Sequence, residues 1–389
     1  MKEISLENAE LVLPDEKILK GSILIRDETI AEISLENEHF PAMEVFDLSN
    51  LKLYAGFIDI HNHGAVGFDV NSATATDFLE ISKFLAQKGV TAWLPTLVPD
   101  SDENYVQVIE ALTNAMRLQK NESAAQILGV HYEGVFANEK MCGALHTEFF
   151  KTFARGDEVE TLPKINDEKA IHLTTLAPEI ENGIELIKKL VKQNWIVSIG
   201  HTRGDLEILD AACSAGAKHL THFFNAMTGL HHRDVGVVGW GMTNDAVSFD
   251  IIADGVHVHP KMLQFACRGK ATEKVMLISD SVAPTGLGDG EFEIWGEKIS
   301  VSGGKTQNAR GSIAGSVITM LDAVKMMLSL DFSAGQVSRM ASENPARLLG
   351  IEKTRGSIAA GKQADLVALD ENGNVKLSLV GGKICFRDI

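Results

Sequence analysis

Six histidine and carboxylate side chains stand out in this chain of 389 residues, because each lies at or near the end of a short apolar run. They are His61, His63, Glu133, His201, His222 and Asp280. Imidazole and carboxylate groups are ligands that suit zinc and iron in proteins. Side chains at positions i and i+2 of a strand point to the same side, so His61 and His63 can converge on one ion. This pattern predicts a centre for a divalent metal ion, zinc or iron.

Asp280 ends the apolar segment Met276–Asp280. A carboxylate at this position could cap the following loop, or it could act as a general base toward a water that a metal ion has made more acidic. Because it shares a predicted rim with the other candidates, we interpret Asp280 as the general base. His131 precedes Glu133 by two residues and shares its face, so we expect it to support the ligands rather than to bind the ion.

Arg233 lies in a donor-rich segment, residues 225–234, that follows another of the predicted strands. An arginine there could hold a phosphate through bidentate hydrogen bonds. It could equally be a surface residue paired with Asp234. The residues of this loop alone leave both interpretations open.

The strands that must position these side chains alternate with helical patterns in the middle of the chain. They are predicted over residues 55–60, 90–95, 127–132, 171–176, 196–199, 219–223, 247–252 and 275–279. Eight strand–helix units predict a (β/α)8 TIM barrel, in which the carboxyl ends of the strands form the active face. A doubly wound open sheet is the alternative, but no Gly-x-Gly-x-x-Gly turn follows the first strand. A hairpin is predicted over residues 292–302.

Both ends of the chain differ from this middle part. Short β-type runs at residues 22–26 and 29–33 near the start are matched by runs at 365–369 and 375–380 near the end. We therefore expect one small β-sandwich domain built from both ends. The predicted division is residues 1–54 with 355–389 for this domain, and 55–354 for the metal-dependent barrel.

The composition excludes several classes of partner. With 36 Lys and Arg against 53 Asp and Glu, the formal net charge is -17, which argues against nucleic acid and anionic membranes as partners. The sequence contains no apolar stretch of 18 residues, and its N-terminus lacks an apolar signal core. The four cysteines are widely spaced, which is not typical of disulfide frameworks. We expect a cytoplasmic protein with reduced thiols.

Several segments resemble known families. Residues 56–64 and 356–367 resemble the opening strand and the C-terminal β-domain of the amidohydrolase superfamily. Within it, four segments resemble the N-acetylglucosamine-6-phosphate deacetylases; they are residues 131–134, 200–202, 221–227 and 252–257. Residues 227–233 and 257–260 also look close to the N-acetylgalactosamine-6-phosphate deacetylases, and these motifs do not separate the two epimers.

The resemblance implies a role for each matching residue. Glu133, His201 and His222 match the ligands of the main metal ion, His61 and His63 match members that hold a second ion, and Asp280 matches the catalytic acid and base. The implied substrate contacts are Ala144, Asn225, Ala226, Arg233, His257, Ile313, Ala314 and Gly315. In the family, the arginine reaches the phosphate bound by the neighbouring subunit, which implies a homodimer. One or two ions per subunit are consistent with this pattern.

The expected reaction is hydrolysis of the N-acetyl group of N-acetylglucosamine 6-phosphate, which gives glucosamine 6-phosphate and acetate. Three alternatives remain: the galactosamine epimer as substrate, another amidohydrolase reaction such as cyclic-amide hydrolysis, and a non-catalytic sugar-phosphate sensor. The segment Gly143–His146 departs from the family pattern, because its histidine comes one position late. The resemblance therefore leaves the role of His146 open.

Overall fold

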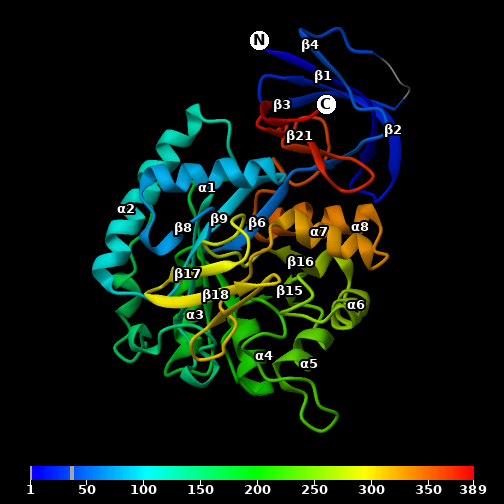
Figure 1. Cartoon of the computed structure of the whole chain (residues 1–389). Helices are drawn as coiled ribbons and strands as arrows, with labels where there is room; N and C mark the ends of the chain where they lie inside the picture. Colours follow the sequence, from blue (N-terminus) through cyan, green and yellow to red (C-terminus); the bar gives the residue numbers. More distant parts are fainter. Residues whose placement is uncertain (1, 36–38) are drawn as a thin grey trace.

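A ring of parallel strands forms the centre of the molecule in the computed structural model, which describes residues 2–35 and 39–389 (Figure 1). In hydrogen-bonded order the ring contains β6 (Phe57–Asn62), β9 (Val90–Leu97), β11 (Gly129–Phe136), β12 (Ile171–Leu176), β13 (Ile196–Ile199), β14 (His219–Leu220), β15 (Ser248–Ile252) and β16 (Val275–Ile278). The short β10 (Gln126–Ile127) also pairs with β9. A parallel bridge between Asn62 and Ser281 brings the last strand back to the first. The predicted barrel is confirmed, and each predicted strand has its counterpart.

Helices surround this ring. They are α1 (Ala75–Gln87), α2 (Asp102–Leu118), α3 (Gly183–Lys192), α4 (Leu206–Ala215), α5 (Gly236–Thr243), α6 (Pro260–Gly269), α7 (Met320–Ser329), α8 (Ala334–Ser338) and α9 (Asn344–Leu348). Capping boxes begin α1 at Thr74 and α7 at Thr319, where each threonine and the aspartate three residues later satisfy each other's backbone N–H groups. Among the described residues, no helix combines the length and the apolar character that crossing a bilayer requires.

Alternation along the barrel strands decides which side chains reach the centre. In β16, Val275 and Leu277 pack outward against the helices, whereas Met276 and Ile278 belong to the apolar cluster inside the barrel. Asp280 continues the inward series two residues later. The same alternation in β11 turns Tyr132 outward and Glu133 inward. The apolar layer thus fills the barrel below a polar rim.

Strands from both ends of the chain form one sheet of eight strands. Its order is β22 (Lys383–Arg387), β21 (Val375–Val380), β20 (Leu366–Leu369), β5 (Lys52–Ala55), β1 (Glu3–Val12), β2 (Ile18–Arg26) and β3 (Thr29–Ser34), and β4 (Glu44–Asp47) pairs with β1. The two ends meet where β5 and β20 pair antiparallel. This sheet has its own apolar cluster, separate from the barrel core. The exact division at residues 54 and 355 stays a prediction, and residues 1 and 36–38 of the first segment lie outside the described residues.

A three-stranded meander follows the last barrel strand. It contains β17 (Gly290–Ile294), β18 (Glu297–Ser302) and β19 (Lys305–Asn308), which confirms the predicted hairpin and extends it by a strand. In Figure 1 these strands, drawn in yellow and light orange, lie in front of the barrel. The remaining short elements are β7 (Gly64–Ala65), β8 (Phe68–Asp69), the 3-10 turns η1 (Val70–Ser72), η2 (Gln119–Asn121), η3 (Glu139–Met141), η4 (Thr147–Phe149), η5 (Glu158–Thr161) and η6 (Thr272–Lys274), and the π-helical turn η7 (Arg339–Glu343).

Candidate active site

Glu133 lies at the centre of the rim, surrounded by four imidazoles. Its Oε1 is 2.9 Å from His222 Nε2 and 3.1 Å from His201 Nε2. His61 Nε2 lies 3.4 Å from the same oxygen, and His63 Nε2 lies 3.3 Å from Oε2. All five side chains are buried. The structure therefore brings together two groups that share Glu133 and could each hold a metal ion: His61 with His63, and His201 with His222.

The donor set fits a divalent cation. The Nε2 atoms of His61 and His63 approach to 3.0 Å, and those of His201 and His222 approach to 3.1 Å. Burial alone would raise the pKa of Glu133, but the surrounding histidines hold it well below its ordinary value. Burial acts in the opposite sense on His63, where hydrogen bonds to Asp280 and Glu133 outweigh it and raise the pKa to about 10. Imidazole nitrogens that converge on a carboxylate in a buried site are suited to a zinc-like or iron-like ion.

The backbone at this rim is strained. His201, His222 and Asp280 all have positive φ angles, of 48°, 35° and 51°. Residues other than glycine rarely adopt this left-handed conformation, and such strain clusters at functional sites. The conformation turns each side chain at the abrupt end of its strand, so that His201 and His222 face Glu133 and Asp280 faces His63.

Hydrogen bonds to main-chain carbonyls orient two of the imidazoles. His63 Nδ1 donates to the carbonyl oxygen of Thr96 at 3.0 Å, and His201 Nδ1 donates to that of Met141 at 2.7 Å. A proton on Nδ1 leaves the Nε2 lone pair free for a ligand. His131 instead uses both ring nitrogens on protein atoms, the Ile60 carbonyl at 3.1 Å and Thr175 Oγ1 at 2.8 Å. Burial also holds the pKa of His131 well below its ordinary value, which agrees with the supporting role expected for it.

Asp250 is a contributor that the sequence interpretation missed. Its Oδ1 accepts a hydrogen bond from the backbone N–H of His222 at 2.5 Å, and its Oδ2 lies 2.9 Å from His219 Nε2. Asp250, which lies within β15, therefore stabilises the strained backbone of His222, a candidate ligand. The signal was present, because a carboxylate interrupts the apolar strand at residues 248–252.

Asp280 lies beside the pair of histidines from β6. Its Oδ1 is 3.2 Å from His63 Nε2 and 3.4 Å from His61 Nε2. Burial opposes ionisation of this carboxylate, but His61 and His63 outweigh that effect and keep its pKa below the usual range. An ionised carboxylate at the metal-ligand cluster can accept a proton, so the geometry suits a general base.

A small cavity of about 170 Å³ opens above the cluster. Of the predicted substrate contacts, the residues that line it are Ala144, Asn225, Ala226, His257, Ile313 and Gly315. Asp254 Oδ2 lies 2.6 Å from His257 Nδ1 and so orients that ring. Ala314 is buried instead in a cluster with Val282, Ile294 and Ile299.

The structure also places two residues that the sequence left open, and one that it did not single out. Arg233 lies on an exposed loop rather than in the cavity wall. His146 lines a neighbouring, larger cavity. Trp295, which the sequence interpretation did not single out, lines both cavities. Its signal was a large aromatic residue directly before glycine in the turn of the predicted hairpin.

Comparison with known proteins agrees with this geometry. Residues 53–385 match the amidohydrolase family. The chain belongs to this family. It is therefore a hydrolase of a metal-dependent family, as the sequence motifs predicted, and it carries His and Glu groups that could bind the metal.

The similar proteins extend over nearly the whole chain. An N-acetylglucosamine-6-phosphate deacetylase of Bacillus subtilis is 34% identical over 393 residues, which cover 99% of this chain and 98% of the relative. An N-acetylgalactosamine-6-phosphate deacetylase of Escherichia coli O157:H7 is 34% identical over 333 residues, with 85% and 87% covered. The crystal structure of the Thermotoga maritima N-acetylglucosamine-6-phosphate deacetylase has a TM-score of 0.86 at 31% identity, with 98% and 99% covered. A Mycobacterium smegmatis mutant deacetylase in complex with N-acetyl-D-glucosamine-6-phosphate has a TM-score of 0.90 at 26% identity, with 99% and 100% covered.

Proposed function

We propose that this amidohydrolase removes the acetyl group of N-acetylglucosamine 6-phosphate and so produces glucosamine 6-phosphate and acetate in amino-sugar catabolism. The observation that carries the proposal is the buried cluster of Glu133, His201 and His222 beside the ionised Asp280. The near full-length similarity to N-acetylglucosamine-6-phosphate deacetylases supplies the substrate.

The proposed reaction needs a metal site, formed by Glu133, His201 and His222, and a proton-transfer group, Asp280. When bound by Glu133, His201 and His222, a divalent ion supplies Lewis acidity, which makes a water more acidic and polarises the amide carbonyl. Asp280 accepts the proton of the attacking water as the new C–O bond forms. It then returns this proton to the amide nitrogen as the C–N bond breaks, so that the sugar leaves as an amine and the acyl group leaves as acetate.

The proposed substrate contacts lie around the cavity. Asn225, Ala226 and His257 approach the sugar from the loops after β14 and β15, while Ala144, Ile313 and Gly315 complete the wall. Ala314 belongs to the same loop as Ile313 and Gly315. Remote binding energy from the phosphate would hold the acetamide at Asp280.

A homodimer is the proposed assembly, with Arg233 reaching the phosphate bound by the neighbouring subunit. The position of Arg233 supports this assignment, because its loop is exposed and stands outside the cavity of its own chain. The net charge of -17 makes a local cation necessary for a phosphate to bind.

The proposed ion is zinc or iron, because imidazole and carboxylate donors suit both. His61 and His63 are the proposed ligands of a second ion, with Glu133 shared between the two positions. The proposed location is the cytoplasm, since the charge of a sugar phosphate prevents it from crossing a bilayer unaided.

N-acetylgalactosamine 6-phosphate is the second candidate substrate, because the Escherichia coli O157:H7 relative that acts on it is also 34% identical. An acetate-release assay with both epimers on protein of known metal content tests the choice. The preferred epimer should give the higher kcat/KM. Removal of the 6-phosphate should abolish efficient turnover, whereas undiminished turnover of the unphosphorylated sugar would favour an amidohydrolase that acts on an uncharged substrate.

Asp280→Asn tests the mechanism. The amide cannot accept the proton of water, so we expect kcat to fall by about 10²–10⁴-fold while the metal content is retained. Acetate release and metal analysis on the same sample give both quantities. Near-normal turnover with retained metal would remove Asp280 from its proposed role.

A further inference from the structure

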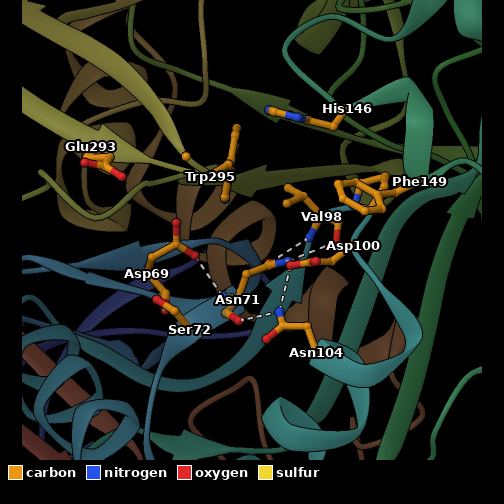
Figure 2. Close-up of a pocket in the computed structure, with 12 residues that line it drawn as sticks. Asp69, Asn71, Ser72, Val98, Asp100, Asn104, His146, Phe149, Glu293 and Trp295 are labelled. Atoms are coloured by element: carbon orange, nitrogen blue, oxygen red, sulfur yellow. Dashed lines mark hydrogen bonds between the residues drawn. The ribbon is translucent and has the colours of Figure 1, made fainter.

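A second cavity of about 630 Å³ adjoins the metal-centre cavity. Trp295 lines both, so its indole forms part of the wall between them. Figure 2 shows Trp295 above Asp69 and Asn71, with Phe149 and His146 also facing the space. The larger cavity would become continuous with the metal centre if the indole were removed.

Three of the proposed sugar contacts lie across the barrel from the second cavity. The proposed sugar contacts Asn225, Ala226 and His257 follow β14 and β15. The second cavity is lined by residues 69–72, 98–100 and 146–149, which follow β6, β9 and β11. In the ring these strands lie across from β14 and β15.

This arrangement determines how the scissile amide of the substrate must be oriented in the metal-centre cavity. Its nitrogen belongs to the sugar, and its carbonyl carbon must lie near Asp280 and the candidate ligands. The acyl chain therefore extends away from Asn225, Ala226 and His257 and toward Trp295. The indole packs edge-to-face on His63, with ring centroids 5.3 Å apart, which places it next to the candidate ligands at that end of the cavity.

Trp295 adopts an unfavourable conformation to occupy this position. It forms a two-residue turn with Gly296 between the paired residues Ile294 and Glu297, and its φ angle is 52°. Such turns favour asparagine or glycine, and a bulky residue with positive φ is uncommon. Among the described residues, its buried indole N–H has no hydrogen-bond acceptor. The positive φ angle and the unpaired indole N–H both destabilise the turn, and local strain of this kind is typical of functional residues.

We propose that Trp295 is the specificity-determining residue for the acyl group: it closes the acyl end of the metal-centre cavity and restricts the enzyme to short N-acyl substrates. This inference rests on the proposed deacetylase function and adds to it the substrate class. Acyl chains longer than acetyl meet the indole, whereas the space behind it could hold several further atoms.

The walls of the second cavity also predict which longer chains would enter an enlarged site. Asp69, Asp100 and Glu293 supply carboxylates, and Asn71 and Asn104 supply amides. Burial raises the pKa of Asp69 to about 6, although hydrogen bonds from the backbone of Asn71 and Trp295 act to lower it. This carboxylate is therefore ionised at pH 8. An acyl chain that ends in an ammonium group should therefore be favoured over a neutral chain of the same length, and an anionic chain should be rejected.

The experiment compares N-acetyl, N-butanoyl, N-β-alanyl and N-succinyl glucosamine 6-phosphate as substrates at pH 8. The wild type should prefer acetyl over butanoyl by at least about 100-fold in kcat/KM, the range expected when a rigid pocket refuses added methylenes. Trp295→Asn, which the turn favours, should reduce this preference to about 10-fold or less. In that variant the β-alanyl substrate should exceed its isostere butanoyl, and the succinyl substrate should be the poorest.

Two matched variants serve as controls. Trp295→Phe keeps an aromatic ring in the wall and should keep most of the preference for acetyl. Phe149→Ala enlarges only the second cavity, which Phe149 lines without lining the first, and should leave the preference unchanged. Binding of the acetyl and butanoyl substrates to the slow Asp280→Asn enzyme, with and without Trp295→Asn, gives a second measure of discrimination by calorimetry.

The outcomes separate the two proposals. If the wild type hydrolyses the acetyl substrate but Trp295→Asn still discriminates by about 100-fold in turnover or in binding, Trp295 does not limit the acyl group. If the wild type releases no acetate from either N-acetyl epimer, the proposed function itself is wrong. A wild type that accepts butanoyl as well as acetyl would also overturn the inference.

Discussion

Histidines occur at both ends of the barrel strands, and their pKa values shift in opposite directions at the two ends. At the carboxyl ends, His63 and His222 lie within 3.3 Å of a Glu133 oxygen. Burial disfavours their charged forms, but the nearby carboxylates outweigh it and raise the pKa values to about 10 and about 9. At the amino end of β12, burial and the nearby Lys164 lower the pKa of His172 to about 4.

The difference teaches that burial disfavours the charged histidine at both ends, and that only the nearby carboxylates at the carboxyl ends overcome it. His63 and His222 face carboxylates that favour a cation, whereas His172 accepts a hydrogen bond from the backbone N–H of Ile165 at 3.1 Å and packs against Trp195. In a TIM barrel, catalytic residues lie at the carboxyl ends of the strands, whereas residues at the amino ends contribute to stability. Substitutions at the two ends should therefore change different quantities.

The largest effect is expected from His222→Asn. This change removes one of the three proposed ligands of the main ion, Glu133, His201 and His222, so the bound metal should be lost. The kcat/KM should fall by more than about 1,000-fold, beyond the 10–100-fold that is usual for residues that only support a ligand. Metal analysis and acetate release on the purified variant measure both losses.

His61→Asn is the matched change in the other group, and its effect should be smaller. If His61 and His63 hold only a second ion, the variant should keep the first ion and part of its activity. Equal losses of metal and activity in the two variants would mean that the two groups act as one site.

Asp250→Asn should have an intermediate effect. The carboxylate holds the backbone of His222, so its loss should weaken metal binding by about 10–100-fold, and an excess of metal should restore most of the turnover. Titration of the metal-free protein against activity shows this recovery. A loss of activity that added metal does not change would indicate that Asp250 acts only on stability.

The smallest effect on catalysis is expected from His172→Gln, which should change the pH dependence of stability instead. The pKa of His172 is lowered from 6.5 to about 4 by folding, so its neutral form stabilises the protein above pH 6.5 and this contribution is lost as the pH falls toward 4. Relative to the variant, the wild type should lose roughly 2 kcal/mol of unfolding free energy between pH 7 and pH 4.5. Urea denaturation of both proteins at the two pH values measures the difference.

The same two proteins supply the control at the active face, because metal content and kcat/KM at pH 7 should match. Parallel stability curves for wild type and variant would mean that His172 is not held neutral at the amino end of β12.

Much of the fold could be predicted because each barrel strand is a short, separate apolar run. The inward direction of Glu133 and Asp280 also follows from alternation along a strand, and the i, i+2 spacing of His61 and His63 agrees with their 3.0 Å approach. The roles of these residues stay predictions until the variants are measured.

Other features depend on contacts that no local pattern encodes. Asp250 supports His222 from the adjacent strand, and Trp295 reaches His63 from a hairpin more than 200 positions away along the chain. The segment Ile313–Gly315 was predicted as a whole, yet its central residue turns away from the cavity into an apolar cluster. Such placements are set by tertiary packing rather than by propensity.

The pairing of β5 with β20 has a consequence for how the protein is made. The ribosome must add about 300 residues after β5 before β20 emerges, which at about 5–20 residues per second takes roughly 15–60 s. During that time β5 presents an unpaired strand edge, and such edges promote aggregation in nascent chains. The sheet can therefore close only after the barrel that lies between β5 and β20 in the chain has been synthesised.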